Sequence, residues 1–215
     1  MNIEQKLLQP GDQRYTIAVP TGYSDETPVP LVLALHFAGH GTPFYGRLIL
    51  EELVEPALGD LGGLIVAPDC TADSWSNAQS EADVLTLLDY VSANYAIDPG
   101  RVIVTGYSMG GNGTWYLAAR NPGRFSAAVA LSGWPSDEVG QVDWQVPIYV
   151  IHSRQDEFMP LEPTQYIVNS LAEQGIEIEL MVLDGITHFE TYRFIEPLKS
   201  VVPWIEQVWQ GKSRS

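Results

Sequence analysis

The sequence predicts an α/β fold: a single domain over residues 1–215 in which a mostly parallel, twisted sheet is covered by helices on both faces. Apolar, β-branched runs such as 31–37 and 102–105 are typical of strands that are buried on both faces. Segments with apolar residues at helical spacing alternate with these runs, as they do in parallel β-α-β units. The connections between the elements are short, and we therefore expect no large cap domain.

The expected strands differ in pattern along the chain. Residues 14–19 alternate between polar and apolar side chains, as an edge or early strand does, whereas most later strands are continuous apolar runs. The last strand begins with alternation and ends with apolar residues. The full set covers residues 14–19, 31–37, 63–68, 102–105, 127–132, 147–153 and 176–183.

Four helices are expected between and after these strands. Over 81–95, the apolar side chains recur at helical spacing and would form one buried stripe. A second helix over 113–120 stops near the Asn-Pro-Gly sequence at 121–123. The third runs from Pro163, which suits a first helical position, to Gly175, which suits a C-terminal cap. The closing helix covers 197–210, with Val201, Val202, Ile205 and Val208 as its expected inner face.

Charge and composition limit the classes of partner. The chain has 27 Asp and Glu against 11 Lys and Arg, which gives a formal net charge of −16 and disfavours nucleic acid and anionic membrane surfaces. Cys70 is the only cysteine, so no internal disulfide is possible. The first residues lack the apolar core of a secretory signal, and no segment approaches eighteen consecutive apolar residues. We therefore expect a cytoplasmic protein that does not bind membranes.

The run over 101–111 (Arg-Val-Ile-Val-Thr-Gly-Tyr-Ser-Met-Gly-Gly) predicts a buried strand, a sharp turn and a helix, with Ser108 at the apex. Gly106 and Gly110 stand two residues to either side, where the close approach of strand and helix leaves no room for a Cβ. Only the serine hydroxyl then points outward, as in a nucleophile elbow. The bare pattern G-x-S-x-G is weak, and the flanking strand and helix supply its specificity.

A serine is a poor nucleophile near neutral pH unless a base lies within hydrogen-bond reach and a carboxylate orients that base. His188 follows the last expected strand, in a loop at the same end of the sheet as Ser108, and is the candidate base. His36 and His152 each lie at the end of a strand, where a structural role is favoured. His40 either lines the mouth of the site or is exposed.

The candidate acid follows the preceding strand, where Asp156 and Glu157 stand side by side. Asp156 is preferred because the order Ser108, Asp156, His188 is that of an α/β-hydrolase triad. Each interval between these residues holds one helix and its flanking strand or loop. Asp184 is the reserve candidate, disfavoured because it lies on the same strand-loop segment as His188.

An oxyanion hole is the third requirement, because charge that develops on a carbonyl oxygen must meet preorganised donors. Met109 directly follows the serine and begins its helix, so its N–H is one candidate donor. The loop over 35–41 follows an early strand and is expected to supply the other donor from Ala38. A plain glycine turn is the alternative reading of that loop.

These residues carry a resemblance to a known family. The stretch 98–115, continued by 121–128 (Asn-Pro-Gly-Arg-Phe-Ser-Ala-Ala), resembles the phospholipase/carboxylesterase group of α/β-hydrolases. It also resembles the predicted-peptidase and polyhydroxybutyrate-depolymerase-like esterases, and the similarity extends over most of the chain from about residue 31. The resemblance implies the α/β-hydrolase fold. It places Ser108, Asp156 and His188 at the triad positions, and Ala38 and Met109 at the oxyanion positions.

Two positions depart from the family pattern. Phe37 replaces the usual glycine after His36, which bears on the shape of the oxyanion loop and the acyl side of the pocket. Ser153 replaces the glycine after His152, a milder change.

We therefore predict a serine-dependent carboxylesterase that cleaves small to medium acyl esters through an acyl-enzyme. A thioesterase or small peptidase with the same triad, or a non-catalytic binding protein on this fold, are the alternatives. No metal or organic cofactor is expected, because no set of His, Cys and carboxylate residues shows ligand spacing. The expected partner is a small-molecule ester, and the oligomeric state stays open. The candidate apolar walls of the pocket, each equally compatible with ordinary packing, are Phe37, Trp75, Trp134, Phe158 and Met159.

Overall fold

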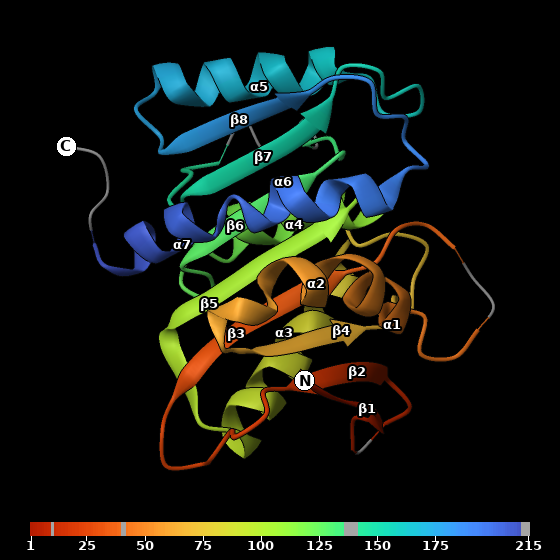
Figure 1. Cartoon of the computed structure of the whole chain (residues 1–215), viewed down its shortest axis with the longest axis vertical. Coiled ribbons are helices and arrows are strands. Elements are labelled where there is room, and N and C mark those ends of the chain that lie inside the picture. Colours follow the sequence, from red (N-terminus) through yellow and green to blue (C-terminus); the bar gives the residue numbers. More distant parts are fainter. Residues whose placement is uncertain (10, 40–41, 136–141, 212–215) are drawn as a thin grey trace.

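The computed structural model describes residues 1–9, 11–39, 42–135 and 142–211. Its centre is one eight-stranded sheet with the order β1-β2-β4-β3-β5-β6-β7-β8 (Figure 1). β2 pairs antiparallel with both β1 and β4, and all other neighbours are parallel. The strands are β1 Asn2–Leu7, β2 Arg14–Val19, β3 Val29–Leu35, β4 Leu64–Pro68, β5 Ile97–Tyr107, β6 Ala127–Leu131, β7 Ile148–Ser153 and β8 Ile178–Leu183.

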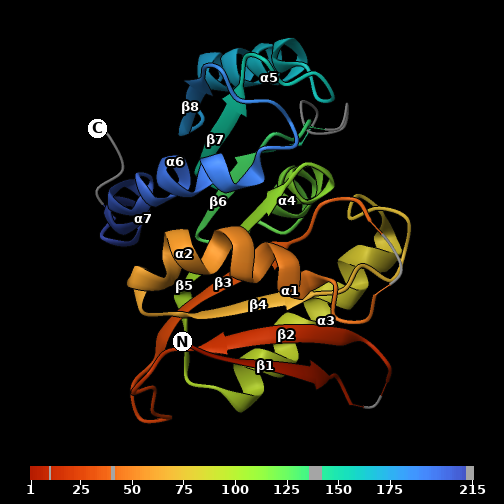
Figure 2. The same ribbon diagram turned by 45° about the vertical axis from the view of Figure 1, so that its right-hand side comes forward.

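Helices cover both faces of this sheet, as predicted (Figure 2). On one face lie α3 Ala78–Asn94, α4 Met109–Arg120 and α5 Leu161–Glu173. On the other lie α1 Gly46–Ile49 and α2 Glu55–Leu58, joined by a π-helical segment over Leu50–Val54, together with α6 Ile195–Lys199 and α7 Val202–Trp209. A short 3-10 helix, Thr191–Phe194, precedes α6.

Two hydrophobic cores fill the space between the sheet and the two helical layers. Along β3, Leu31, Leu33 and Leu35 point into the core beneath α3, α4 and α5, whereas Val32 and Ala34 point into the other. All five side chains are completely buried. Because successive residues of a strand face opposite cores, a central strand must be apolar at every position, which explains its continuous apolar run.

The structure differs from the sequence prediction at several elements. β1 was not expected, because most of its side chains are exposed and its pattern is polar; backbone pairing with β2 defines it. The helical segment over 46–58 was also missed, although its buried residues recur at helical spacing. The predicted closing helix over 197–210 is divided into α6 and α7. Pro203 lies in the first turn of α7, where it cannot donate a hydrogen bond to the preceding turn.

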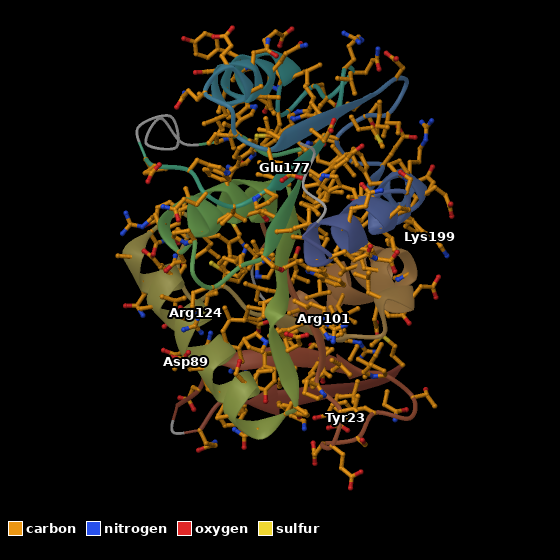
Figure 3. All side chains as sticks on the ribbon, turned by 90° about the vertical axis from the view of Figure 1, so that its left-hand side faces the viewer. Tyr23, Asp89, Arg101, Arg124, Glu177 and Lys199 are labelled. Carbon is orange, nitrogen blue, oxygen red and sulfur yellow. The ribbon has the colours of Figure 1, made fainter. Side chains whose placement is uncertain are left out.

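The parallel strands end at one edge of the sheet, on the right of Figure 1, and the loops that follow β5, β7 and β8 lie at that edge. Figure 3 views the opposite edge, where these strands begin. Its surface carries ion pairs such as Arg124 with Asp89 (2.5 Å) and Arg101 with Asp98 (2.6 Å). Within the described part of the chain, no helix combines the length and the apolar character needed to cross a bilayer.

Candidate active site

Ser108 occupies a strained turn between β5 and α4. Its backbone has φ 56° and ψ −117°, outside the regions that non-glycine residues ordinarily adopt. The Ser108 N–H donates to the carbonyl of Leu131 on β6 (3.0 Å), and the Ser108 carbonyl accepts from Asn112 in α4 (3.0 Å). The neighbouring elements therefore hold the turn on both sides, with the serine side chain at the apex.

The glycines flanking Ser108 let β5, α4 and β3 approach one another closely. A Cβ on Gly106 would lie 2.4 Å from the carbonyl oxygen of Gly110, and one on Gly110 would lie 2.0 Å from the carbonyl oxygen of Leu35. Both positions are thus closed to any side chain, as the elbow pattern predicts. This close packing of backbone against backbone fixes where the serine hydroxyl sits.

The structure brings the three predicted side chains together at the ends of β5, β7 and β8. The His188 Nε2 lies 2.9 Å from the Ser108 Oγ, and the His188 Nδ1 lies 2.9 Å from each carboxylate oxygen of Asp156. Since the carboxylate is an acceptor, Nδ1 carries the proton and Nε2 is free to accept one from the serine. The three residues are 4–6% exposed, so water competes little for these hydrogen bonds.

The Asp156 carboxylate is held ionised by donors that surround it. Its Oδ1 accepts hydrogen bonds from the backbone N–H groups of Phe158 (3.1 Å) and Met159 (2.7 Å). Burial alone would raise the pKa of Asp156, but the hydrogen bonds from His188 and Met159 outweigh it and lower the pKa below its usual value. A permanent negative charge therefore faces the imidazole.

His152 supports the turn that carries the acid. Its Nε2–H donates to the carbonyl of Met159 (2.6 Å), and this nitrogen also lies 3.8 Å from Asp156 Oδ2. The ring is completely buried and burial lowers its pKa, which keeps it neutral. The structural role predicted for His152 agrees with these contacts.

The loop that carries His188 is fixed by contacts on both its sides. The Tyr107 hydroxyl donates to the His188 carbonyl (2.6 Å), and the His188 N–H donates to the Glu157 carboxylate (3.0 Å). Ser153, which stands where the family pattern has glycine, donates its hydroxyl to the Ile186 carbonyl (2.5 Å). Tyr107 was not among the predicted site residues, although its place in the G-x-S-x-G pattern puts it beside Ser108.

Asp184, the reserve acid, points away from this site. Its carboxylate pairs with Arg154 Nε (3.1 Å), and 71% of its side chain is exposed. Asp156, the preferred candidate, and not Asp184 therefore lies against His188.

Of the two predicted oxyanion donors, Met109 directly follows Ser108, and Ala38 lies in the loop after β3. Met109 is the first residue of α4, so its N–H has no acceptor within the helix. The loop that holds Ala38 is fixed through His36. Trp75 donates its indole N–H to the His36 carbonyl (2.9 Å). The His36 ring hydrogen-bonds the Phe37 carbonyl through Nδ1 and accepts a hydrogen bond from the Cys70 N–H at Nε2.

The candidate pocket residues fall into three groups. Trp75 is 1% exposed and donates its indole N–H to the His36 carbonyl, and its place in a pocket wall stays a prediction. Met159 is 8% exposed and acts on the acid through its backbone. Phe37 and Trp134 are half-buried, and Phe158 is 61% exposed beside His188. His40 lies outside the described residues.

A separate polar cavity of about 800 Å³ opens beside the loop after β3. Its described lining includes His36, Gly39 and Tyr45, from that loop and the segment after it. Ser108, Asp156 and His188 are not part of this described lining. Elsewhere in the described residues, no three His, Cys, Asp or Glu side chains gather into a possible metal site.

Residues 69–196 match the sequence model of the Dienelactone hydrolase family, over more than half of the chain. The chain belongs to the dienelactone hydrolase family. This family has the predicted α/β-hydrolase fold, and the matched residues include Ser108, Asp156 and His188.

Curated relatives of this dienelactone hydrolase family member are distant. Feruloyl esterase C of Emericella nidulans is 24% identical over 170 residues, which are 76% of this chain and 62% of that protein. Protein usf of Aquifex pyrophilus is 26% identical over 119 residues, 54% of this chain and 52% of that one. The chain thus spans about half to three-fifths of these relatives.

Solved structures share the fold closely. A thermostable esterase has a TM-score of 0.73 and 25% identity, over 95% of this chain and 60% of that one. Est1E from Butyrivibrio proteoclasticus also has a TM-score of 0.73, over 96% of this chain and 99% of that one, at 15% identity. These neighbours agree with the α/β-hydrolase architecture.

Proposed function

We propose that this chain is a serine-dependent carboxylic ester hydrolase that cleaves small to medium acyl esters through an acyl-enzyme. The observation that carries the proposal is the unbroken line of hydrogen bonds from the Ser108 hydroxyl through the His188 ring to the Asp156 carboxylate. A buried serine with an imidazole nitrogen at 2.9 Å and an ionised carboxylate behind that imidazole is an activated nucleophile.

The first step of the proposed reaction forms the acyl-enzyme. Ser108 Oγ attacks the ester carbonyl carbon as its proton passes to His188 Nε2, and Asp156 stabilises the resulting imidazolium. The carbonyl oxygen becomes an oxyanion, which the N–H groups of Met109 and Ala38 stabilise. When the intermediate collapses, the C–O bond to the alcohol breaks and His188 gives the proton to the departing oxygen.

The second step releases the acid. Water enters where the alcohol left, His188 Nε2 takes its proton, and the hydroxide attacks the acyl carbon. Collapse of this second intermediate breaks the bond to Ser108 Oγ, and the proton returns from His188 to the serine. The site is thereby restored.

Family membership and the esterase names of its relatives support an ester as the substrate. An assay with three substrate types tests this choice: p-nitrophenyl esters of two to eight carbons, the matching acyl thioesters, and aminoacyl amides. We expect the esters to be turned over with the highest kcat/KM. Faster turnover of the thioesters or the amides would replace the esterase proposal by a thioesterase or a peptidase.

Ser108→Ala is the matching variant. It should retain the folded circular dichroism spectrum and lose about 10³-fold or more in kcat, because only the oxyanion donors and binding remain. Ester hydrolysis at the wild-type rate in Ser108→Ala would contradict the assigned nucleophile.

A further inference from the structure

Two exposed phenylalanines flank the imidazole of His188. Phe158 is 61% exposed and its ring centroid lies 5.2 Å from that of His188; Phe189 is 76% exposed and lies 5.5 Å from it. The two phenyl rings are 6.4 Å apart and tilted by 57°. Large apolar side chains that cluster and are exposed to solvent are typical of a binding surface.

Both side chains start from backbone that the site itself holds in place. The Phe158 N–H donates to Asp156 Oδ1, and Phe189 directly follows His188, whose own N–H donates to Glu157. The backbone that carries both rings is therefore fixed relative to the imidazole. A fixed backbone lowers the ordering cost of binding at this surface.

The chemistry of His188 decides which part of an ester this surface meets. The imidazolium must give its proton to the departing alcohol oxygen, so that oxygen has to lie within hydrogen-bond reach of Nε2. The alcohol group attached to it then extends past the imidazole. Phe158 and Phe189, whose ring centroids lie 5.2 and 5.5 Å from that of the imidazole, are therefore within reach of the alcohol part of the ester.

We propose that Phe158 and Phe189 form a leaving-group subsite that selects esters of alcohols bearing a planar aromatic ring. The inference rests on the proposed ester hydrolysis. Two tilted phenyl rings about 6 Å apart present both a face and an edge, and a third aromatic ring can make offset or edge-to-face contacts with them. A saturated ring of the same size has no π face and cannot stack on either phenyl ring.

Three acetate esters with similar leaving-group acidity test the subsite: benzyl, cyclohexylmethyl and ethyl acetate. All three form the same acetyl-enzyme, so differences in kcat/KM report on the alcohol group alone. We expect the wild-type protein to prefer benzyl over ethyl acetate by roughly tenfold or more, and over cyclohexylmethyl acetate by about threefold.

Phe158→Ala and Phe189→Ala should each lower the benzyl-to-ethyl ratio by roughly three- to tenfold. The milder Phe158→Leu and Phe189→Leu keep an apolar side chain and should bring the benzyl-to-cyclohexylmethyl ratio close to one. Tyr166→Ala is the matched control. Tyr166 is 73% exposed on α5 and has no ring contact with His188 in the described structure, so both ratios should stay at wild-type values.

An aromatic acyl group provides the decisive comparison. The preference for ethyl phenylacetate over ethyl acetate should be the same in the wild-type protein and in the phenylalanine variants. If that preference falls while the benzyl-to-ethyl ratio holds, the rings contact the acyl group and the inference is overturned. Unchanged ratios for both series would mean that the rings only shield His188, which also overturns it. Absence of hydrolysis of every ester by the wild-type protein would instead reject the proposed function.

Discussion

Replacement of Gly110 by alanine should damage both stability and activity. A Cβ there would lie 2.0 Å from the carbonyl oxygen of Leu35 and 2.6 Å from its carbonyl carbon. Such contacts do not occur below 3.0 Å, so α4 must withdraw from β3 by about 1 Å. Overpacking of this kind costs about 1–3 kcal/mol. Better helix propensity returns at most about 1 kcal/mol, and because backbone atoms make the clash, we expect the free energy of unfolding to fall.

The same displacement moves the start of α4, where Ser108 and the Met109 N–H are located. A misplacement of about 1 Å at reacting groups can lower a rate by about 100-fold. Urea unfolding and kcat/KM for p-nitrophenyl acetate measure the two effects. Gly123→Ala is the control, since a Cβ at Gly123 meets nothing within 4 Å. If Gly110→Ala equals the wild-type protein in both measurements, the argument that close packing positions Ser108 is refuted.

Three further variants, with Asp184→Asn as the control for the first, test the contacts of the site. Asp156→Asn should lower kcat by about 10⁴-fold, whereas Asp184→Asn, at an exposed ion pair, should stay within about twofold; the reverse ranking would identify the wrong acid. Tyr107→Phe leaves the buried carbonyl of His188 without its donor and should reduce the free energy of unfolding by about 1–3 kcal/mol in urea, an expectation that an unchanged midpoint would contradict. Burial lowers the pKa of His152, so the unfolded chain binds a proton that the folded chain does not, and stability falls as pH drops below about 6.5. His152→Gln should therefore lose less stability than the wild-type protein between pH 7.5 and 5.5, and equal losses would argue against a buried neutral ring.

The elbow and the positions of its partners were predictable because each depends on local or topological rules. Gly106 and Gly110 mark the turn within five residues of sequence. Asp156 and His188 follow strands that are parallel to β5, and parallel strands necessarily present their C-terminal ends at one edge. Asp156 is preferred over Asp184 because Asp184 lies on the same strand-loop segment as His188.

The surroundings of the site depended on contacts between distant residues, which no local pattern carries. Trp75 and Phe158 are both aromatic residues in loops, yet one is buried under the carbonyl of His36 and the other is exposed beside His188. The bond from Tyr107 to the His188 carbonyl joins residues 81 positions apart. Phe189 was not predicted, although the sequence carries a local signal for it: Phe189 directly follows His188, the candidate base.

Reaction with a fluorophosphonate probe, followed by intact-mass measurement and peptide mapping, tests most directly whether Ser108 is an activated nucleophile. We expect one adduct per chain, on Ser108, as its Oγ bonds to phosphorus and fluoride departs, and no adduct on folded Ser108→Ala. A wild-type protein that stays unlabelled, or a label that persists in Ser108→Ala, would contradict it.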